Sequence, residues 1–163
     1  MVGNWERSLN KWIRNLGPYG VSEADFVARR AEMSKRPEGW TDRDALWSLF
    51  NEAVTRTDPS QLRGLYYLMA LFLNEEGRDH LTPLRASAEI ELRQMKLHGI
   101  REVAVSPAPD ACDACKELAE KKYTIEQALK EKTLPCSQCT HKFREKDQNA
   151  FCRCSYVAVI EGL

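Results

Sequence analysis

The sequence predicts a mainly helical α+β protein, in which an N-terminal bundle of about five helices precedes a small cysteine-rich α/β module. Apolar residues recur at helical spacing up to residue 99, and short strand-like runs follow only after it. All six cysteines lie between Cys112 and Cys154. We therefore expect two domains, a helical domain at 1–99 and a cysteine module at 100–163.

The first three helices are predicted from apolar stripes and start signals. The first helix has apolar residues at i, i+4, i+7, i+8 and i+11 and ends at Gly17. Ser22 with Asp25 predicts the N-terminal cap of the second helix, and Thr41 with Asp44 predicts that of the third. The stripe of the first helix consists of Trp5, Leu9, Trp12, Ile13 and Leu16.

A fourth helix is expected to begin with Asp58 as its N-cap and Pro59 in the first helical position. Its body at 65–73 is apolar nearly all round, which predicts a position at the centre of the bundle. The alternative is a groove or pocket lined by Tyr66, Tyr67 and Met69.

A fifth helix is predicted to begin at Thr82-Pro83 and to end at Gly99 in a left-handed C-cap. His80 and His98 flank this helix, and we expect them to be solvated or capping groups, because no histidine pair has the i, i+4 spacing of a helical metal site.

Short strands and helices are expected to alternate after residue 99. Strands are predicted around 100–105, at Tyr123 and over 151–160, and helices around 116–119 and after a capping box formed by Thr124 and Gln127.

Charge and hydropathy exclude some classes of partner. The chain has 24 basic and 24 acidic residues, whereas a protein that holds DNA electrostatically usually has a basic excess. The longest apolar run, 65–73, is far shorter than the about 20 residues that span a bilayer. The N-terminus is charged and amphipathic, unlike a signal peptide. We therefore expect a cytoplasmic protein that has no membrane partner, and nucleic-acid binding is disfavoured.

Clustered thiols in a reducing compartment more often hold a metal ion than form disulfides. Zinc takes four thiolate or imidazole ligands in a tetrahedron at about 2.0–2.3 Å, and a Cys-x-x-Cys turn directs two sulfurs at one point. Cys112 and Cys115 are the strongest such pair. The predicted metal ligands are four of the five residues Cys112, Cys115, Cys139, Cys152 and Cys154.

The remaining ligand positions are less constrained by the sequence. Cys152 and Cys154 are expected to project from one face of a strand, because side chains alternate along a strand with a period of two. Cys136 is the expected spare, since it follows a proline and is crowded by Cys139. His141 is a further candidate ligand.

A closed site with four protein ligands leaves no position for a substrate, so the predicted zinc is structural and the protein is not expected to be an enzyme. A redox role for Cys112 and Cys115 is a less favoured alternative, because no βαβ unit precedes this motif and Asp110 and Asp113 would raise the thiol pKa. The three histidines form no hydrolytic motif.

Three stretches of the module resemble the C-terminal zinc-binding-type module of the Mu F-like phage head-morphogenesis family. They are Asp110-Ala111-Cys112-Asp113-Ala114-Cys115-Lys116-Glu117-Leu118, Tyr123-Thr124-Ile125-Glu126-Gln127-Ala128 and Cys152-Arg153-Cys154-Ser155-Tyr156-Val157. The resemblance covers about residues 100–160 and implies site positions at Cys112, Cys115, Cys152 and Cys154. This chain departs from the family at Cys136 and Cys139, where that family often has a histidine.

The resemblance implies a minor component of a phage head, or a standalone bacterial or prophage protein that uses the same module. We expect a non-enzymatic, zinc-stabilised protein that binds another protein. The alternative is a nucleic-acid-binding zinc protein that uses basic residues around the metal. Those residues are Lys142, Arg144, Lys146 and Arg153, and Glu145 and Asp147 lie among them.

Overall fold

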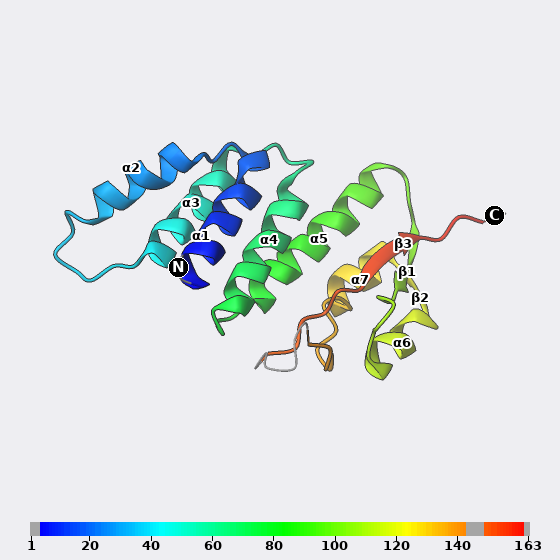
Figure 1. Cartoon of the computed structure of the whole chain (residues 1–163). Helices are drawn as coiled ribbons and strands as arrows, with labels where there is room; N and C mark the ends of the chain where they lie inside the picture. The colour runs from blue at the N-terminus through cyan, green and yellow to red at the C-terminus, as the bar shows by residue number, and fades with distance from the viewer. Residues whose placement is uncertain (1–3, 143–148, 162–163) are drawn as a thin grey trace. The chain divides into compact units, whose positions relative to one another are not determined.

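The computed structural model describes residues 4–142 and 149–161, apart from the side chains of residues 4 and 5. The protein is mainly helical with one small antiparallel sheet, which confirms the predicted fold class. Figure 1 shows the elements, which are α1 (Asn4–Leu16), η1 (Gly17–Tyr19), α2 (Glu23–Met33), α3 (Asp42–Arg56), α4 (Leu62–Glu75), α5 (Leu81–Leu97), β1 (Glu102–Ser106), α6 (Asp113–Ala119), β2 (Lys122–Thr124), α7 (Ile125–Glu131) and β3 (Ser155–Ala158). None of the described helices has the length and apolar character needed to cross a bilayer.

The chain divides into two compact units, Met1–Leu65 and Tyr66–Leu163. In the first unit, α3 contacts both α1 and α2. Trp12 and Phe50 are fully buried, and their rings meet edge to face with centroids 6.2 Å apart. The predicted caps are present, since Ser22 forms a capping box at the start of α2 and Thr41 forms one at the start of α3. The side chain of Trp5 lies outside the described residues.

The fourth helix begins later than predicted. Residues 59–61 form a turn, and α4 starts at Leu62. The Asp58 carboxylate accepts a hydrogen bond from the backbone N–H of Ser60 at 2.8 Å, so it closes a tight turn instead of capping a helix. Further along α4, Met69 is buried and Tyr67 packs edge-on against Phe151, with ring centroids 5.7 Å apart.

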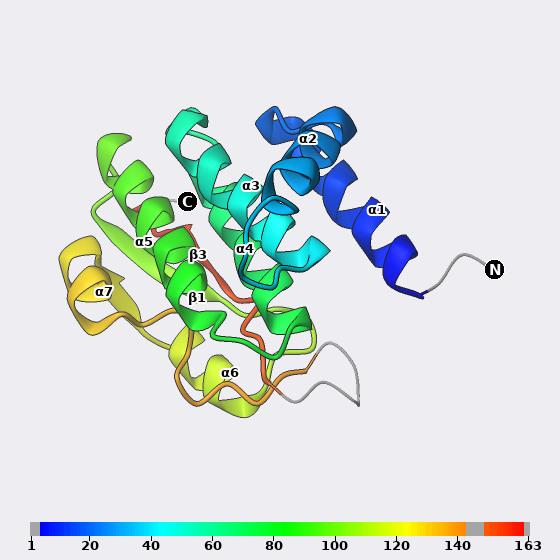
Figure 2. The same ribbon diagram turned by 90° about the vertical axis from the view of Figure 1, so that its left-hand side faces the viewer.

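The second unit is built on a three-stranded antiparallel sheet of order β2-β1-β3. α5 contacts β3 and α7, and α6 contacts β1, as Figure 2 shows from the side. Because α5 packs with the sheet, it belongs to the same compact unit as the cysteine module, whereas the sequence placed the domain boundary after it at 99/100. The core of this unit includes Val103, Ile125 and Phe151.

The final strand is shorter than predicted. β3 begins at Ser155, which pairs with Ser106, the last residue of β1. Pro107 follows and has no N–H to donate, so the ladder cannot continue towards Cys154. Cys152 and Cys154 therefore lie in irregular chain before β3, and the prediction that they share a strand face is wrong.

Candidate metal centre

Three separate segments of the second unit bring cysteines together. Cys112 is the N-cap residue of α6, and Cys115 lies in its first turn. Cys139 lies in a turn that follows α7. Its backbone N–H donates a hydrogen bond to the carbonyl of Cys136 at 3.2 Å. Cys152 and Cys154 precede β3. β2 and α7 lie between the first two of these segments, and they are held in place because β2 pairs with β1 and Thr124 caps α7.

The sulfurs form two overlapping groups. Cys112, Cys115 and Cys139 lie within 4.8 Å of one another, and so do Cys115, Cys152 and Cys154. Cys115 belongs to both groups, and its Sγ lies 3.9 Å from that of Cys152. Two sulfurs bound to one tetrahedral zinc at 2.3 Å lie about 3.8 Å apart. The five cysteines that the sequence proposed as metal ligands are therefore the five that the fold gathers, and together they could hold a metal ion.

Burial and hydrogen bonds shift the pKa values of these thiols in opposite directions. Burial raises the pKa of Cys112, but hydrogen bonds led by that from the Thr140 backbone amide outweigh it and lower this pKa to about 6. Burial and the neighbouring Cys152 raise the pKa of Cys115. A hydrogen bond from Cys154 lowers the pKa of Cys152.

The same network raises the pKa of Cys154, chiefly through Cys152 and then through burial, and burial raises that of Cys139. Three of the five thiols therefore resist ionisation. A bound cation reverses this preference, because a metal-coordinating thiol loses its proton. The donor chemistry fits a soft, thiolate-binding metal.

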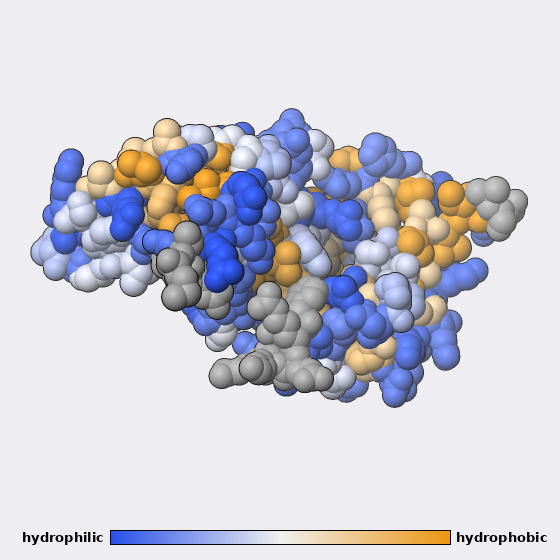
Figure 3. Space-filling view, viewed as in Figure 1, coloured by the Kyte–Doolittle hydropathy of each residue, from blue (hydrophilic) through white to orange (hydrophobic). Residues whose placement is uncertain are grey.

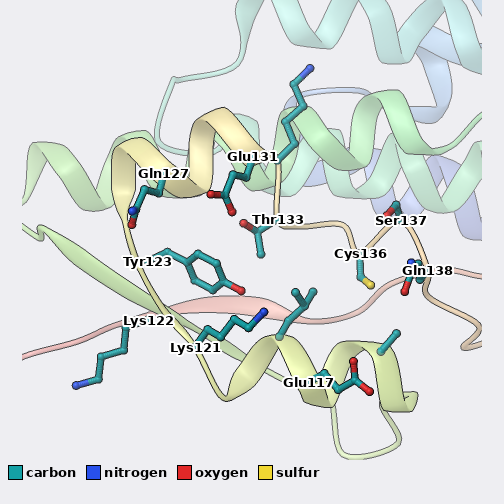
Figure 4. A pocket seen from close by; sticks show the side chains of 13 residues that line it. Glu117, Lys121, Lys122, Tyr123, Gln127, Glu131, Thr133, Cys136, Ser137 and Gln138 are labelled. Atoms are coloured by element: carbon teal, nitrogen blue, oxygen red, sulfur yellow. The ribbon is translucent and has the colours of Figure 1, made fainter.

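Cys136 lies outside both sulfur groups. It lines a cleft of about 790 Å³ bordered by α6, β2 and α7, together with Tyr123 and Thr133 (Figure 4). Lysines and glutamates both border this cleft, so its rim has no single sign of charge. They are Glu117, Lys121, Lys122, Glu131 and Lys132.

The sequence did not predict that two charged residues of the cysteine segments, Asp110 and Arg153, bond to each other. The Arg153 guanidinium donates a hydrogen bond to Asp110, and Nε2 of His141 lies 3.7 Å from the other Asp110 oxygen. Burial raises the pKa of Asp110, but its own backbone amide and Arg153 outweigh this and lower the pKa. The available signal was the position of Asp110 and Arg153, each within two residues of a cysteine.

His141, a candidate ligand from the sequence, is outside both sulfur groups and beside Asp110 instead. Of the basic residues in the nucleic-acid alternative, Arg153 is bound to Asp110, and Lys142 is exposed. Arg144 and Lys146 lie outside the described residues, as do Glu145 and Asp147.

Comparison with protein-family models, with curated proteins and with solved structures finds no match to this chain.

Proposed function

We propose that this is a non-enzymatic protein whose cysteine module is held together by one structural zinc ion and that it binds another protein. One observation carries the proposal. Five thiols from three separated segments form two groups, and within each group the sulfurs lie within 4.8 Å of one another. Cys115 belongs to both groups. Zinc is the common metal for all-thiolate structural sites, and its binding energy becomes folding energy for the segments that it joins.

The proposed ligands are Cys112, Cys115, Cys139 and Cys152. The first three form one of the sulfur groups, and Cys152 is 3.9 Å from Cys115. Cys154 then remains as a hydrogen-bond donor to Cys152.

The burial of two of the four proposed ligands, the other two being half-buried, supports a structural role. Cys115 is 1% exposed and Cys152 is 5% exposed. Four protein thiolates complete the coordination of zinc, so no position is left for water or substrate. We therefore propose that the metal stabilises the module and that the surface of the module carries the function.

A protein partner is supported by apolar surface at the end of β3. Val157 is 43% exposed and Ile160 is 55% exposed. Figure 3 shows hydrophobic residues gathered beside the C-terminal end of the described chain. The net charge of zero favours an apolar partner surface over a polyanion.

The metal is tested by native mass spectrometry of the full chain, with a thiol count after unfolding without reductant. One zinc ion per chain and six free thiols are expected. Cys136→Ser is the matched control, because Cys136 lies outside the sulfur groups, and it should keep the zinc. A chain without metal and with fewer than six free thiols would contradict the proposal and favour disulfides.

The partner surface is tested by cross-linking the tagged full chain in a cell extract. A protein partner should be lost in the double variant Val157→Lys and Ile160→Lys. It should be retained in Val27→Lys, a matched change at an exposed valine of α2. Retention of the wild-type protein on DNA, weakening steeply with salt, would count against a protein partner.

A thiol redox function is the second candidate, because Cys112 is half-buried and its pKa is about 6. The two proposals predict different rates of alkylation of Cys112. A zinc-bound Cys112 thiolate should react slowly with iodoacetamide until a chelator is added, whereas a redox-active thiolate should react rapidly in the untreated protein.

A further inference from the structure

Each of the three segments that carry cysteines also carries a charged or titratable side chain within two residues of a cysteine. Asp110 precedes Cys112 by two residues, His141 follows Cys139 by two, and Arg153 stands between Cys152 and Cys154. The Arg153 guanidinium donates to one oxygen of Asp110, and the other oxygen is 3.7 Å from Nε2 of His141. One oxygen of the Asp110 carboxylate therefore contacts Arg153 of the third segment, and the other lies near His141 of the second.

We propose that Asp110 is a positioning residue for the metal centre and that it holds the three cysteine segments in register through Arg153 and His141. This inference rests on the proposed zinc site. The cysteine segments lie outside the sheet, since β1 ends at Ser106 and β3 begins at Ser155. Strand ladders therefore do not fix them, and side-chain contacts between the segments have to contribute.

Two backbone hydrogen bonds contribute to the arrangement of the three cysteine segments, one between two segments and one within a segment. Phe151 donates its N–H to the carbonyl of His141 at 2.7 Å, which ties the second segment to the third. The Ala111 N–H bonds the carbonyl of Ala108 at 2.9 Å, which closes a turn within the first segment. The Asp110–Arg153 bond ties the first segment to the third, next to Cys152.

The exposure of the pair limits its expected effect. The side chains of Asp110 and Arg153 are 55% and 32% exposed. An exposed ion pair alone changes an equilibrium constant by at most about fivefold. Removal of a residue that orients metal ligands weakens metal binding about 10- to 100-fold. We expect about tenfold weaker zinc binding, at the lower end of that range.

Charge alone predicts the opposite sign. A zinc ion with four thiolates has two net negative charges, so a nearby carboxylate disfavours the loaded site. If Asp110 acted only through its charge, Asp110→Asn would leave zinc binding unchanged or strengthen it. A positioning role predicts weaker binding.

The experiment uses the full chain and measures zinc affinity by competition with a chromophoric chelator. Asp110→Asn and Arg153→Gln are each expected to weaken zinc binding about tenfold. The double variant should be about as weak as either single variant, because the two residues act through each other. Glu126→Gln is the matched control. It breaks the exposed Lys96–Glu126 pair, 2.8 Å long and in the same unit, and should change affinity less than about twofold.

Cobalt absorption separates positioning from direct ligation. Cobalt-loaded Asp110→Asn should keep the ligand-field absorption of the wild-type protein, because no metal ligand is removed. Shifted ligand-field bands with an intact thiolate band would mean that Asp110 itself binds the metal and would overturn the positioning role. A zinc affinity of Asp110→Asn within twofold of that of the wild-type protein would also overturn the positioning role. If the wild-type chain still binds zinc, the proposed function stands. A wild-type chain that binds no zinc would overturn both.

A second variant is used if Asp110→Asn does not fold. Arg153→Lys keeps the positive charge but loses the planar, two-pronged donor of arginine. It should also weaken zinc binding, and unchanged binding in this variant would overturn the proposal.

Discussion

Cys152 and Cys154 are separated by one residue, yet their surroundings differ. Cys152 is 5% exposed and lies 3.9 Å from the sulfur of Cys115, whereas Cys154 is half-buried and donates a hydrogen bond to Cys152. We predict that Cys152→Ser loses zinc and that Cys154→Ser, its matched control, retains it. Native mass spectrometry after equal exposure to a chelator checks this. Loss of zinc from Cys154→Ser alone would assign the fourth ligand to Cys154.

The Tyr156 hydroxyl satisfies a buried backbone group. It accepts a hydrogen bond from the Leu134 N–H at 3.0 Å, and both residues are buried. Tyr156→Phe leaves that N–H without its partner, so the free energy of unfolding should fall by about 1–3 kcal/mol. Urea unfolding at pH 7 measures the change. Tyr66→Phe, at a half-buried position of α4, is the control and should cost less.

The same residue predicts a loss of stability at alkaline pH. Burial raises the pKa of Tyr156 to about 12, above the unfolded value near 10. A raised folded pKa gives stability that is complete below pH 10 and is lost as the pH rises towards 12. Between these pH values, wild type should therefore lose more stability than Tyr156→Phe. Parallel pH dependences would show that the folded protein does not hold Tyr156 protonated.

At the scale of elements, capping boxes fix where several helices begin. Thr124 accepts a hydrogen bond from the Gln127 N–H at 3.1 Å, and the Gln127 side chain accepts one from the Thr124 N–H at 2.9 Å. We predict that Thr124→Ala lowers the free energy of unfolding by about 1 kcal/mol. Thr124→Ser keeps the hydroxyl and is the control. Equal losses in the two variants would show that the methyl group, not the cap, stabilises this position.

These boxes were visible in the sequence because every partner lies within three residues. The errors had two causes, one local and one set by a neighbour far along the chain. Asp58 had the residues for a cap but closed a turn with Ser60. The apolar run after Phe151 indicated a long strand, but β3 is limited by its partner β1, which ends before Pro107.

The candidate site shows the same division. Cys-x-x-Cys and Cys-Arg-Cys spacing pointed to Cys112, Cys115, Cys152 and Cys154, because short spacing constrains where two sulfurs can point. Cys139 was added instead of Cys136 because Cys136 follows a proline and is crowded by Cys139. The Asp110–Arg153 bond joins residues 43 positions apart, and nothing local in the sequence indicates it. Cys136, the cysteine expected from the sequence to be spare, lies outside both sulfur groups.

At the scale of the whole molecule, the two compact units have different sources of stability. The buried residues of the first unit, such as Trp12, Leu46 and Phe50, are apolar, and no cysteine lies before Cys112. The core of the second unit contains Cys115, Cys136 and Cys152 beside Val103 and Phe151. Metal loss should therefore act on the second unit, where the ligands are part of the core.

We predict that chelation removes hydrogen-exchange protection unevenly along the full chain. Backbone amides of β1, α6 and β3 should lose protection, because zinc-dependent segments open when the metal leaves. Amides of α1 and α3 should keep theirs, since these helices pack on each other in the first unit, whose sequence contains no cysteine. Exchange measured by mass spectrometry with and without chelator gives this map, and Cys136→Ser serves as a metal-retaining control. A uniform loss of protection across both units would mean that the zinc stabilises the whole chain as one cooperative body.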